Sequence, residues 1–174
     1  MERLKYMKAF VLSVLFVLTM QNVNAQNLSF NELTTYLDIK KDKMDSLLKQ
    51  KNYLFEKEGA FDTGRGSVYT YHNKKKGPGN FIALYANKFT DAFFNTSIVF
   101  VTTNVDEQNA IKKTLIDEKF TTDGTLPLTY TSSKYIVVYN ILNINSNYKP
   151  VSITIKDLKN QMFIDLMRKA KMQD

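Results

Sequence analysis

Twice along this chain, apolar residues spaced as in a helix are followed by residues spaced as in strands. Apolar residues recur every three or four positions from residue 33 to 48 and again from 110 to 115. After each of these stretches the period falls to about two, which is typical of strands with one buried face. The connections between the strands are too short for parallel crossovers. The sequence therefore predicts an α+β fold in which helices pack an antiparallel sheet.

The first helix has a recognisable start. Ser29 and Glu32 have the spacing of a capping box, and Leu28 and Leu33 have the spacing of a hydrophobic staple. A polar stretch at residues 38–43 separates two helical stripes, so the pattern fits two short helices or one kinked helix. A further helix is expected at 106–118, a glycine-rich loop at 59–66, and strands at 53–58, 67–72, 80–87, 96–103, 120–122, 128–131, 134–142 and 151–156.

The two halves of the chain have similar junctions between helix and strand. Leu48 is followed at a short distance by the aromatic Tyr53, and Leu115 by the aromatic Phe120. Each junction precedes three more strands, which indicates two degenerate helix-plus-four-strand repeats at about residues 29–104 and 105–157. Both repeats lie in one α+β domain, residues 26–158. Residues 159–174 are expected to form a C-terminal amphipathic helix that is basic toward its end.

Residues 1–25 have the pattern of a secretory signal peptide, with a basic start, an apolar run from Ala9 to Met20 and short residues before the expected cleavage site, Ala25/Gln26. A membrane anchor is the alternative, but spanning a bilayer takes about 20 apolar residues and this run ends at Gln21. No cysteine follows the run, so a lipoprotein is excluded. We expect a secreted or periplasmic protein with no membrane span in the mature chain.

The composition excludes several kinds of site. The 174 residues include no cysteine and one histidine, which excludes disulfide scaffolds, cysteine-ligated zinc and thiol nucleophiles. The formal net charge is +7, but the basic residues are scattered and an exported chain meets envelopes and secreted proteins rather than nucleic acid. We therefore expect no cofactor, no metal, no nucleic-acid partner and no catalytic residues.

The strands also predict two chemically different sheet faces, because successive side chains lie on opposite sides of a strand. Apolar helices need an apolar partner, so aliphatic positions such as Ile82 and Ile153 are expected to face the helices. The other face is then expected to carry the candidate partner-binding residues Tyr69, Tyr71, Tyr85, Tyr135 and Tyr139. Tyrosine is enriched at protein interfaces. The alternative is that tyrosine favours strands, and that this face is solvated or covered by loops and the C-terminal helix.

Other motifs indicate ordinary surface features. His72 has no nucleophile and orienting acid that the sequence identifies, so it is interpreted as a surface histidine. The run Lys74–Lys76 is interpreted as a solubilising hairpin tip, with contact to acidic glycans or anionic lipid head groups as the alternative. The pair Asp117 and Glu118 has a lysine beside it and fits a solvated helix face better than a glycosidase site.

The order of these features resembles that of small secreted proteins of Bacteroidetes-type bacteria. It comprises a signal peptide, a capped helix, a helix ending in Leu-Leu-x-x-x-x-Tyr-x-Phe, tyrosine-rich strands, a lone central helix and a second set of strands. The tandem plan is also similar to the β-lactamase-inhibitory-protein fold and, more distantly, to small envelope-assembly lipoproteins. The likeness covers most of residues 29–156 and implies a fold and export. No residue role carries over, and the missing lipoprotein cysteine and disulfides are departures.

Together these features favour an exported, non-catalytic module that binds or inhibits an unknown protein partner. A second hypothesis is an envelope-associated structural protein, in which the basic segment 158–171 makes a peripheral contact with the envelope. A third is a hydrolase whose site the sequence does not reveal.

Overall fold

The structure is a computed structural model that describes residues 27–61, 66–77, 79–89, 92–122, 124, 128–142, 150–160 and 162. The leader predicted at residues 1–25 lies outside this part of the chain. So does the C-terminal helix, except for a first helical turn that begins at Leu158. Among the described residues, no helix is long and apolar enough to cross a membrane.

Three helices begin and end close to the expected positions. Helix α2 spans Phe30–Leu37, α3 spans Lys41–Gln50 and α4 spans Val105–Asp117, so the first helical region is two short helices. The capping box is present: the Ser29 hydroxyl accepts from the Glu32 amide, and the Glu32 carboxylate accepts from the Ser29 amide. Asn104 caps α4 by accepting from the backbone amides of Asp106 and Glu107.

The strands form one antiparallel sheet of eight strands, in the order β1-β2-β3-β4-β8-β7-β6-β5. Their bounds are Tyr53–Phe61 (β1), Gly66–Asn73 (β2), Phe81–Phe89 (β3), Ala92–Thr102 (β4), Thr121–Thr122 (β5), Leu128–Thr131 (β6), Tyr135–Ile141 (β7) and Val151–Asp157 (β8). The predicted fold class is confirmed. The loop expected at 59–66 is too long, because β1 continues to Phe61 and β2 begins at Gly66.

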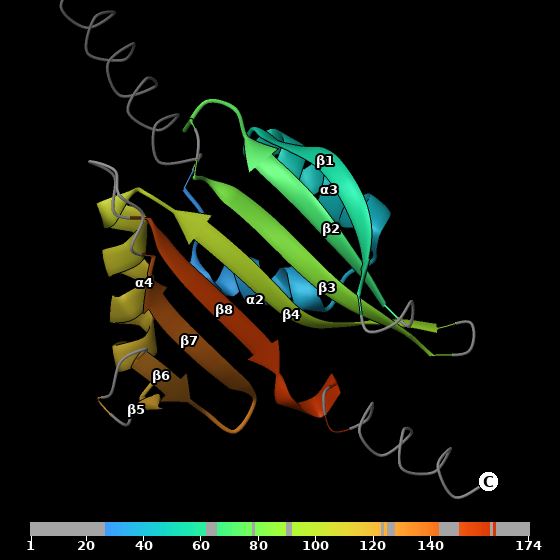
Figure 1. Cartoon of the computed structure of the whole chain (residues 1–174). Helices are drawn as coiled ribbons and strands as arrows, with labels where there is room; N and C mark the ends of the chain where they lie inside the picture. Colours follow the sequence, from blue (N-terminus) through green and yellow to red (C-terminus); the bar gives the residue numbers. More distant parts are fainter. Residues whose placement is uncertain are drawn as a thin grey trace, which may run out of the picture.

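Each half of the sheet is a meander, and the two meanders meet where β4 pairs with β8 (Figure 1). The junctions that precede them have the same backbone geometry. Asn52 and Lys119 have φ angles of 63° and 59°, each between a helix end and an aromatic residue. Leu48 and Leu115 stand at the same distance before these two residues, and both are fully buried. The same local device therefore turns the chain from helix to sheet twice.

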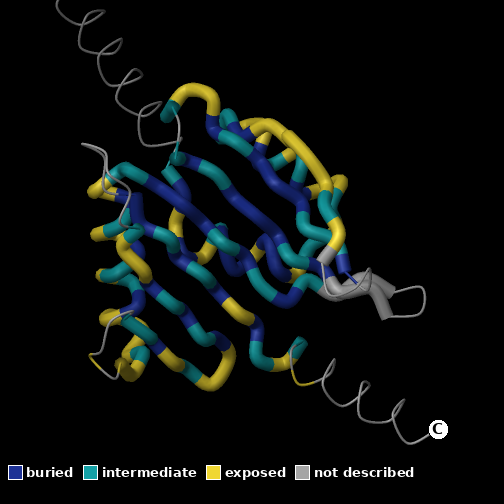
Figure 2. The backbone as a smooth tube through the Cα atoms, viewed as in Figure 1, coloured by how far each residue is buried: buried dark blue, intermediate teal, exposed yellow. Residues whose placement is uncertain are grey.

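The helices cover one face of the sheet, and the core lies between them and that face (Figures 1 and 2). Helix α2 packs over β4 and β8 at the centre, and α3 packs beside β1. The Phe30 ring of α2 makes edge-to-face contacts with Phe120 and Tyr135, at 5.6 and 6.0 Å between ring centroids. These contacts join the two halves into one core.

Four of the five tyrosines predicted to face away from the helices lie on the helix-covered face. Tyr69, Tyr71, Tyr135 and Tyr139 are 1–9% exposed, and only Tyr85 lies on the opposite face. Pairing shows this directly, since Tyr71 stands opposite the buried Ile82, and Tyr139 opposite the buried Ile153. The prediction of a single uncovered tyrosine face is therefore wrong.

The physical reason is that the helix layer offers tyrosine both apolar cover and polar partners. The Tyr71 hydroxyl donates to the carboxylate of Asp45 on α3. Burial, followed by this hydrogen bond, raises the pKa of Tyr71. Lys112 of α4 lies 4.5 Å from the centroid of the Tyr139 ring, and burial raises the pKa of Tyr139 to about 12. A buried tyrosine therefore keeps its ring in the core while its hydroxyl reaches the helices.

Tyr53 differs from the other core tyrosines. Its hydroxyl is buried and has no hydrogen-bond partner among the described residues. The side chain of nearby Asn73 donates to the carbonyl of Lys51 and accepts from the amides of Lys75 and Lys76. Removing this hydroxyl therefore removes a buried polar group that makes no hydrogen bond of normal geometry.

We expect Tyr53→Phe and Tyr71→Phe to have opposite effects on stability. Tyr71→Phe removes a hydrogen bond to a charged acceptor and should lower the free energy of unfolding by about 1.5 kcal/mol. Tyr53→Phe should leave it unchanged or raise it by up to about 1 kcal/mol. Denaturant unfolding of both variants measures this, and a larger loss for Tyr53→Phe than for Tyr71→Phe would contradict the assignment.

Candidate functional site

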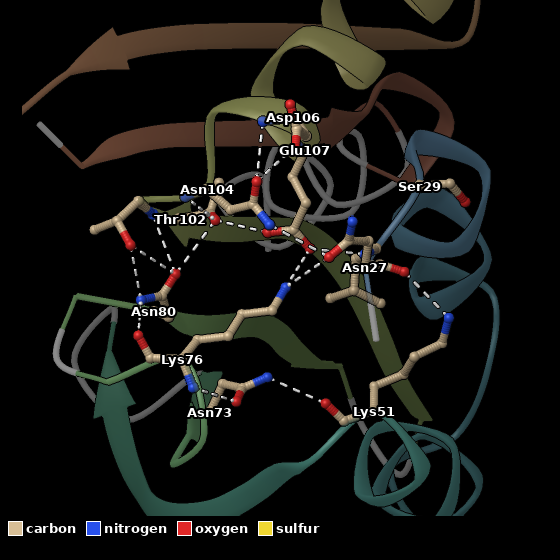
Figure 3. A network of polar contacts seen from close by, with 12 residues as sticks. Asn27, Ser29, Lys51, Asn73, Lys76, Asn80, Thr102, Asn104, Asp106 and Glu107 are labelled. Carbon is tan, nitrogen blue, oxygen red and sulfur yellow. Dashed lines mark hydrogen bonds and ion pairs between the residues drawn. The ribbon is translucent and has the colours of Figure 1, made fainter. Parts of the chain in front are cut away.

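Two features of the described chain stand out as candidate sites: a buried polar network at one end of the sheet, and the sheet face without helices. The network centres on Glu107, in the first turn of α4, whose side chain is 0% exposed. Figure 3 shows it between the N-terminal segment, the β2–β3 turn and the end of β4. No sequence pattern indicates this network, because its members are far apart in the chain.

Every oxygen of the Glu107 carboxylate has a partner. Oε1 accepts from the ammonium of Lys76 at 2.6 Å and from the backbone amide of Leu28 at 2.9 Å. Oε2 accepts from the hydroxyl of Thr102 at 2.7 Å. Lys76 belongs to the run predicted as a solvated tip, but its side chain is 14% exposed and lies inward, whereas Lys74 and Lys75 are exposed.

Asn80 continues the network along the sheet edge. Its side-chain amide donates to the carbonyl of Lys76, and its side-chain oxygen accepts from the backbone amide of Thr103. The N-terminal segment is held from the other side, where Lys51 donates to the carbonyl of Asn27 at 3.1 Å. We call Glu107, Lys76 and Lys51, together with the groups of Asn27 and Leu28 that they bind, the polar clamp.

The polar clamp fits a structural role better than a catalytic one. A general acid or base needs a free position for the reacting group, whereas the Glu107 carboxylate is occupied by three donors from this chain. Among the described residues, no group of three or more His, Cys, Asp or Glu side chains lies close enough to hold a metal ion.

The second feature is the sheet face opposite the helices, across which no described element passes (Figure 1). Cross-strand pairs place alternate residues of five neighbouring strands on this open face. It comprises Val68, Thr70, His72, Phe81, Ala83, Tyr85, Ser97, Val99, Val101, Ser152, Thr154, Lys156, Ile136, Val138 and Asn140. Most of these side chains are uncharged, and Phe81, Tyr85, Val99, Ile136 and Val138 are partly exposed.

A shallow hollow lies at the β1–β3 end of the open face. Thr70 and Ala83 are its smallest lining residues, and Phe81 and Tyr85 line it beside them. His72 stacks on Phe81 with 5.6 Å between ring centroids, and its Nε2 lies 2.9 Å from the carboxylate of Glu56. Both partners of this pair are more than a third exposed. His72 is therefore a surface residue, as the sequence indicated, and it fixes one wall of the hollow.

Charge on the open face is confined to its margins. The exposed lysines Lys57 and Lys156 flank the uncharged centre from β1 and β8. These two lysines outnumber the one carboxylate at these margins, Glu56, so the net charge on the described part of this face is positive. A surface of this kind is complementary to an apolar patch with acidic groups around it.

Comparison with known proteins gives no further guide to these two features. No protein-family model, curated protein or solved structure matches the chain.

Loss of the Glu107 charge should strongly destabilise the protein. Glu107→Gln leaves the Lys76 ammonium buried without a counter-charge, which typically costs about 3–5 kcal/mol. The matched control is Lys113→Ala, which breaks an exposed i,i+4 pair with Asp117 and should change the free energy of unfolding by less than about 0.5 kcal/mol. Denaturant unfolding compares the two, and similar losses would refute the structural role of the clamp.

A pH dependence follows from Glu32, next to the clamp. Burial on its own raises the pKa of Glu32, but hydrogen bonds from Lys51 and Ser29 outweigh it and hold the pKa below its ordinary value of 4.5. The stabilisation is therefore fully present above that ordinary value and is lost as pH falls through the lower folded-state value.

We expect the stability gap between the wild type and Glu32→Gln to be widest near neutral pH and to close in acid. Unfolding curves recorded from about pH 7 down to about pH 3 test this, since that range crosses the ordinary carboxyl pKa. A gap that keeps the same size over the whole range would show that the Glu32 charge contributes nothing.

Proposed function

We propose that the chain is an exported, non-catalytic module that binds a protein partner through the open face of its sheet. One observation carries the proposal: five neighbouring strands present mostly uncharged side chains, many of them partly exposed, on a face that no described helix covers. A broad face that mixes apolar, hydroxyl and aromatic side chains and carries little charge has the composition of the centre of a protein interface. This replaces the five-tyrosine surface, of which only Tyr85 lies on this face.

The form of the open face favours a protein partner over a small molecule. Small ligands are bound in concave pockets that enclose most of their surface, whereas the hollow beside Phe81 is shallow and open to solvent. Protein interfaces are broad, with an uncharged centre and a polar margin. The margin here carries Lys57 and Lys156. The partner we propose therefore has an apolar patch with acidic groups around it. An inhibitor-like module would act by covering such a patch on its target.

A pair of substitutions in the middle of the open face should abolish binding. Val138 and Thr154 stand opposite each other on β7 and β8 and are partly exposed. Val138→Arg with Thr154→Arg places two charges in the uncharged centre. After chemical cross-linking in the native envelope fraction, we expect at least a tenfold loss of the product formed by the wild type, and weaker binding by the wild type at raised salt.

The matched control is Ile116→Arg, because Ile116 is 67% exposed and lies on α4, on the other side of the molecule. It should keep the full yield of product, and thermal unfolding should show that all variants are folded. Equal yield from the face variant and the wild type would count against the open face as the binding surface. Loss of binding only after removal of residues 158–174 would favour the envelope-associated role of the C-terminal segment.

A further inference from the structure

The hollow on the open face arises from the way β2 pairs with β3. Thr70 stands opposite Ala83, and both side chains are small and buried. The pairs on either side of them, on the same face, carry larger side chains: His72 with Phe81, and Val68 with Tyr85. A small pair between two larger pairs leaves a depression in the surface of the sheet.

The size of the hollow suits one side chain of a partner. Its volume is about 260 Å³, which is below the range of about 300–1,000 Å³ that small-molecule sites occupy. Phe81 and Tyr85 lie four residues apart on β3, or about 13 Å along the strand, and border the hollow at its two ends. A planar ring placed over Ala83 lies between these two aromatic walls. Aromatic side chains that fill pockets of this kind are typical anchors of protein interfaces.

The wall on the Phe81 side is ordered before a partner binds. The His72 ring stacks on Phe81 with 26° between the ring planes, and the His72 Nε2 lies 2.9 Å from the carboxylate of Glu56. Side chains from three neighbouring strands therefore support one another. A wall that is already held in place loses little conformational entropy on binding, which favours affinity.

The charge that the hollow offers to a partner is that of Lys57. This residue lines the hollow and stands opposite Thr70, so it lies at the β1 end of the floor. The Glu56 carboxylate already has His72 as its partner. Lys57 is exposed and makes no ion pair with any described residue. A carboxylate next to a side chain seated in the hollow would complement Lys57.

We propose that the hollow receives one aromatic side chain of the protein partner, and that a carboxylate beside this side chain binds Lys57. The inference rests on the proposed function and deepens it, because it names the residue types that the partner presents to the open face. The hollow is the anchor point of the interface, and the rest of the open face excludes water around it.

The first test uses two short probes, acetyl-Asp-Phe-amide and acetyl-Asp-Ala-amide, at millimolar concentrations. NMR titration follows the methyl groups of Thr70 and Ala83, which form the floor of the hollow. We expect the Asp-Phe probe to shift both signals in a saturable way and to bind at least about fivefold more tightly than the Asp-Ala probe, since the aromatic ring is the anchor.

Two variants with matched controls extend the test to the whole site. Ala83→Leu fills the hollow and should abolish binding of the Asp-Phe probe, and Lys57→Gln should weaken it at least about threefold. The controls Ala110→Leu and Lys113→Gln make the same changes at exposed positions of α4 and should bind as the wild type does. Thermal unfolding should show that all four variants are folded.

Equal binding of the two probes, or full binding by Ala83→Leu, would overturn the inference. Cross-linking in the native envelope fraction separates this failure from a failure of the proposed function. We expect Ala83→Leu to lower the yield of product at least tenfold. If Ala83→Leu keeps the full yield while Val138→Arg with Thr154→Arg loses it, the open face binds without this anchor. If both variants keep the full yield, the proposed function fails as well.

Discussion

The pairing of β4 with β8 is the interaction on which the rest of the structure depends. Without it, the chain would be two small meanders, each with too little apolar surface for a stable core. With it, Phe100 stands opposite Ile153 and Ile98 opposite Ile155, all four at 0% exposure beneath α2. One continuous core therefore forms on one side of the sheet. The same pairing leaves the other side as one continuous face.

Local signals in the sequence were sufficient to predict the described helices and strands. The capping box at Ser29, the helix-to-strand junctions after Leu48 and Leu115, and the alternation in β3 and β8 all agree with the structure. Each depends on residues close together in the chain. The orientation of β2 and β7 could not be predicted in this way. One face of each strand carries tyrosine and the other carries valine, isoleucine or threonine. Tyrosine can be buried wherever its hydroxyl finds a partner, so this pattern does not show which face is covered. That partner, Asp45 for Tyr71, lies on another element.

The polar clamp shows the same limit more strongly. Lys76 looks like one of three equivalent lysines in a turn, and Glu107 like an ordinary acid in the first turn of a helix. They meet only because the β2–β3 turn and the start of α4 lie at the same end of the sheet (Figure 3). The buried pair stabilises this end only while both charges are present. A sequence pattern gives no sign of which lysine in a run will be buried.

The open face depends on which side chains of each strand point away from the helices. This orientation is the central claim. The chain has no cysteine, and single cysteines can therefore be placed along β7 and β8 and their rates of thiol labelling measured in the folded protein. The structure predicts fast labelling at Ile136, Val138, Ser152 and Thr154, and protection at Val137, Ile153 and Ile155. Fast labelling at Val137 with protection at Ile136 and Val138 would mean that β7 is turned the other way, and the account of the open face would be wrong.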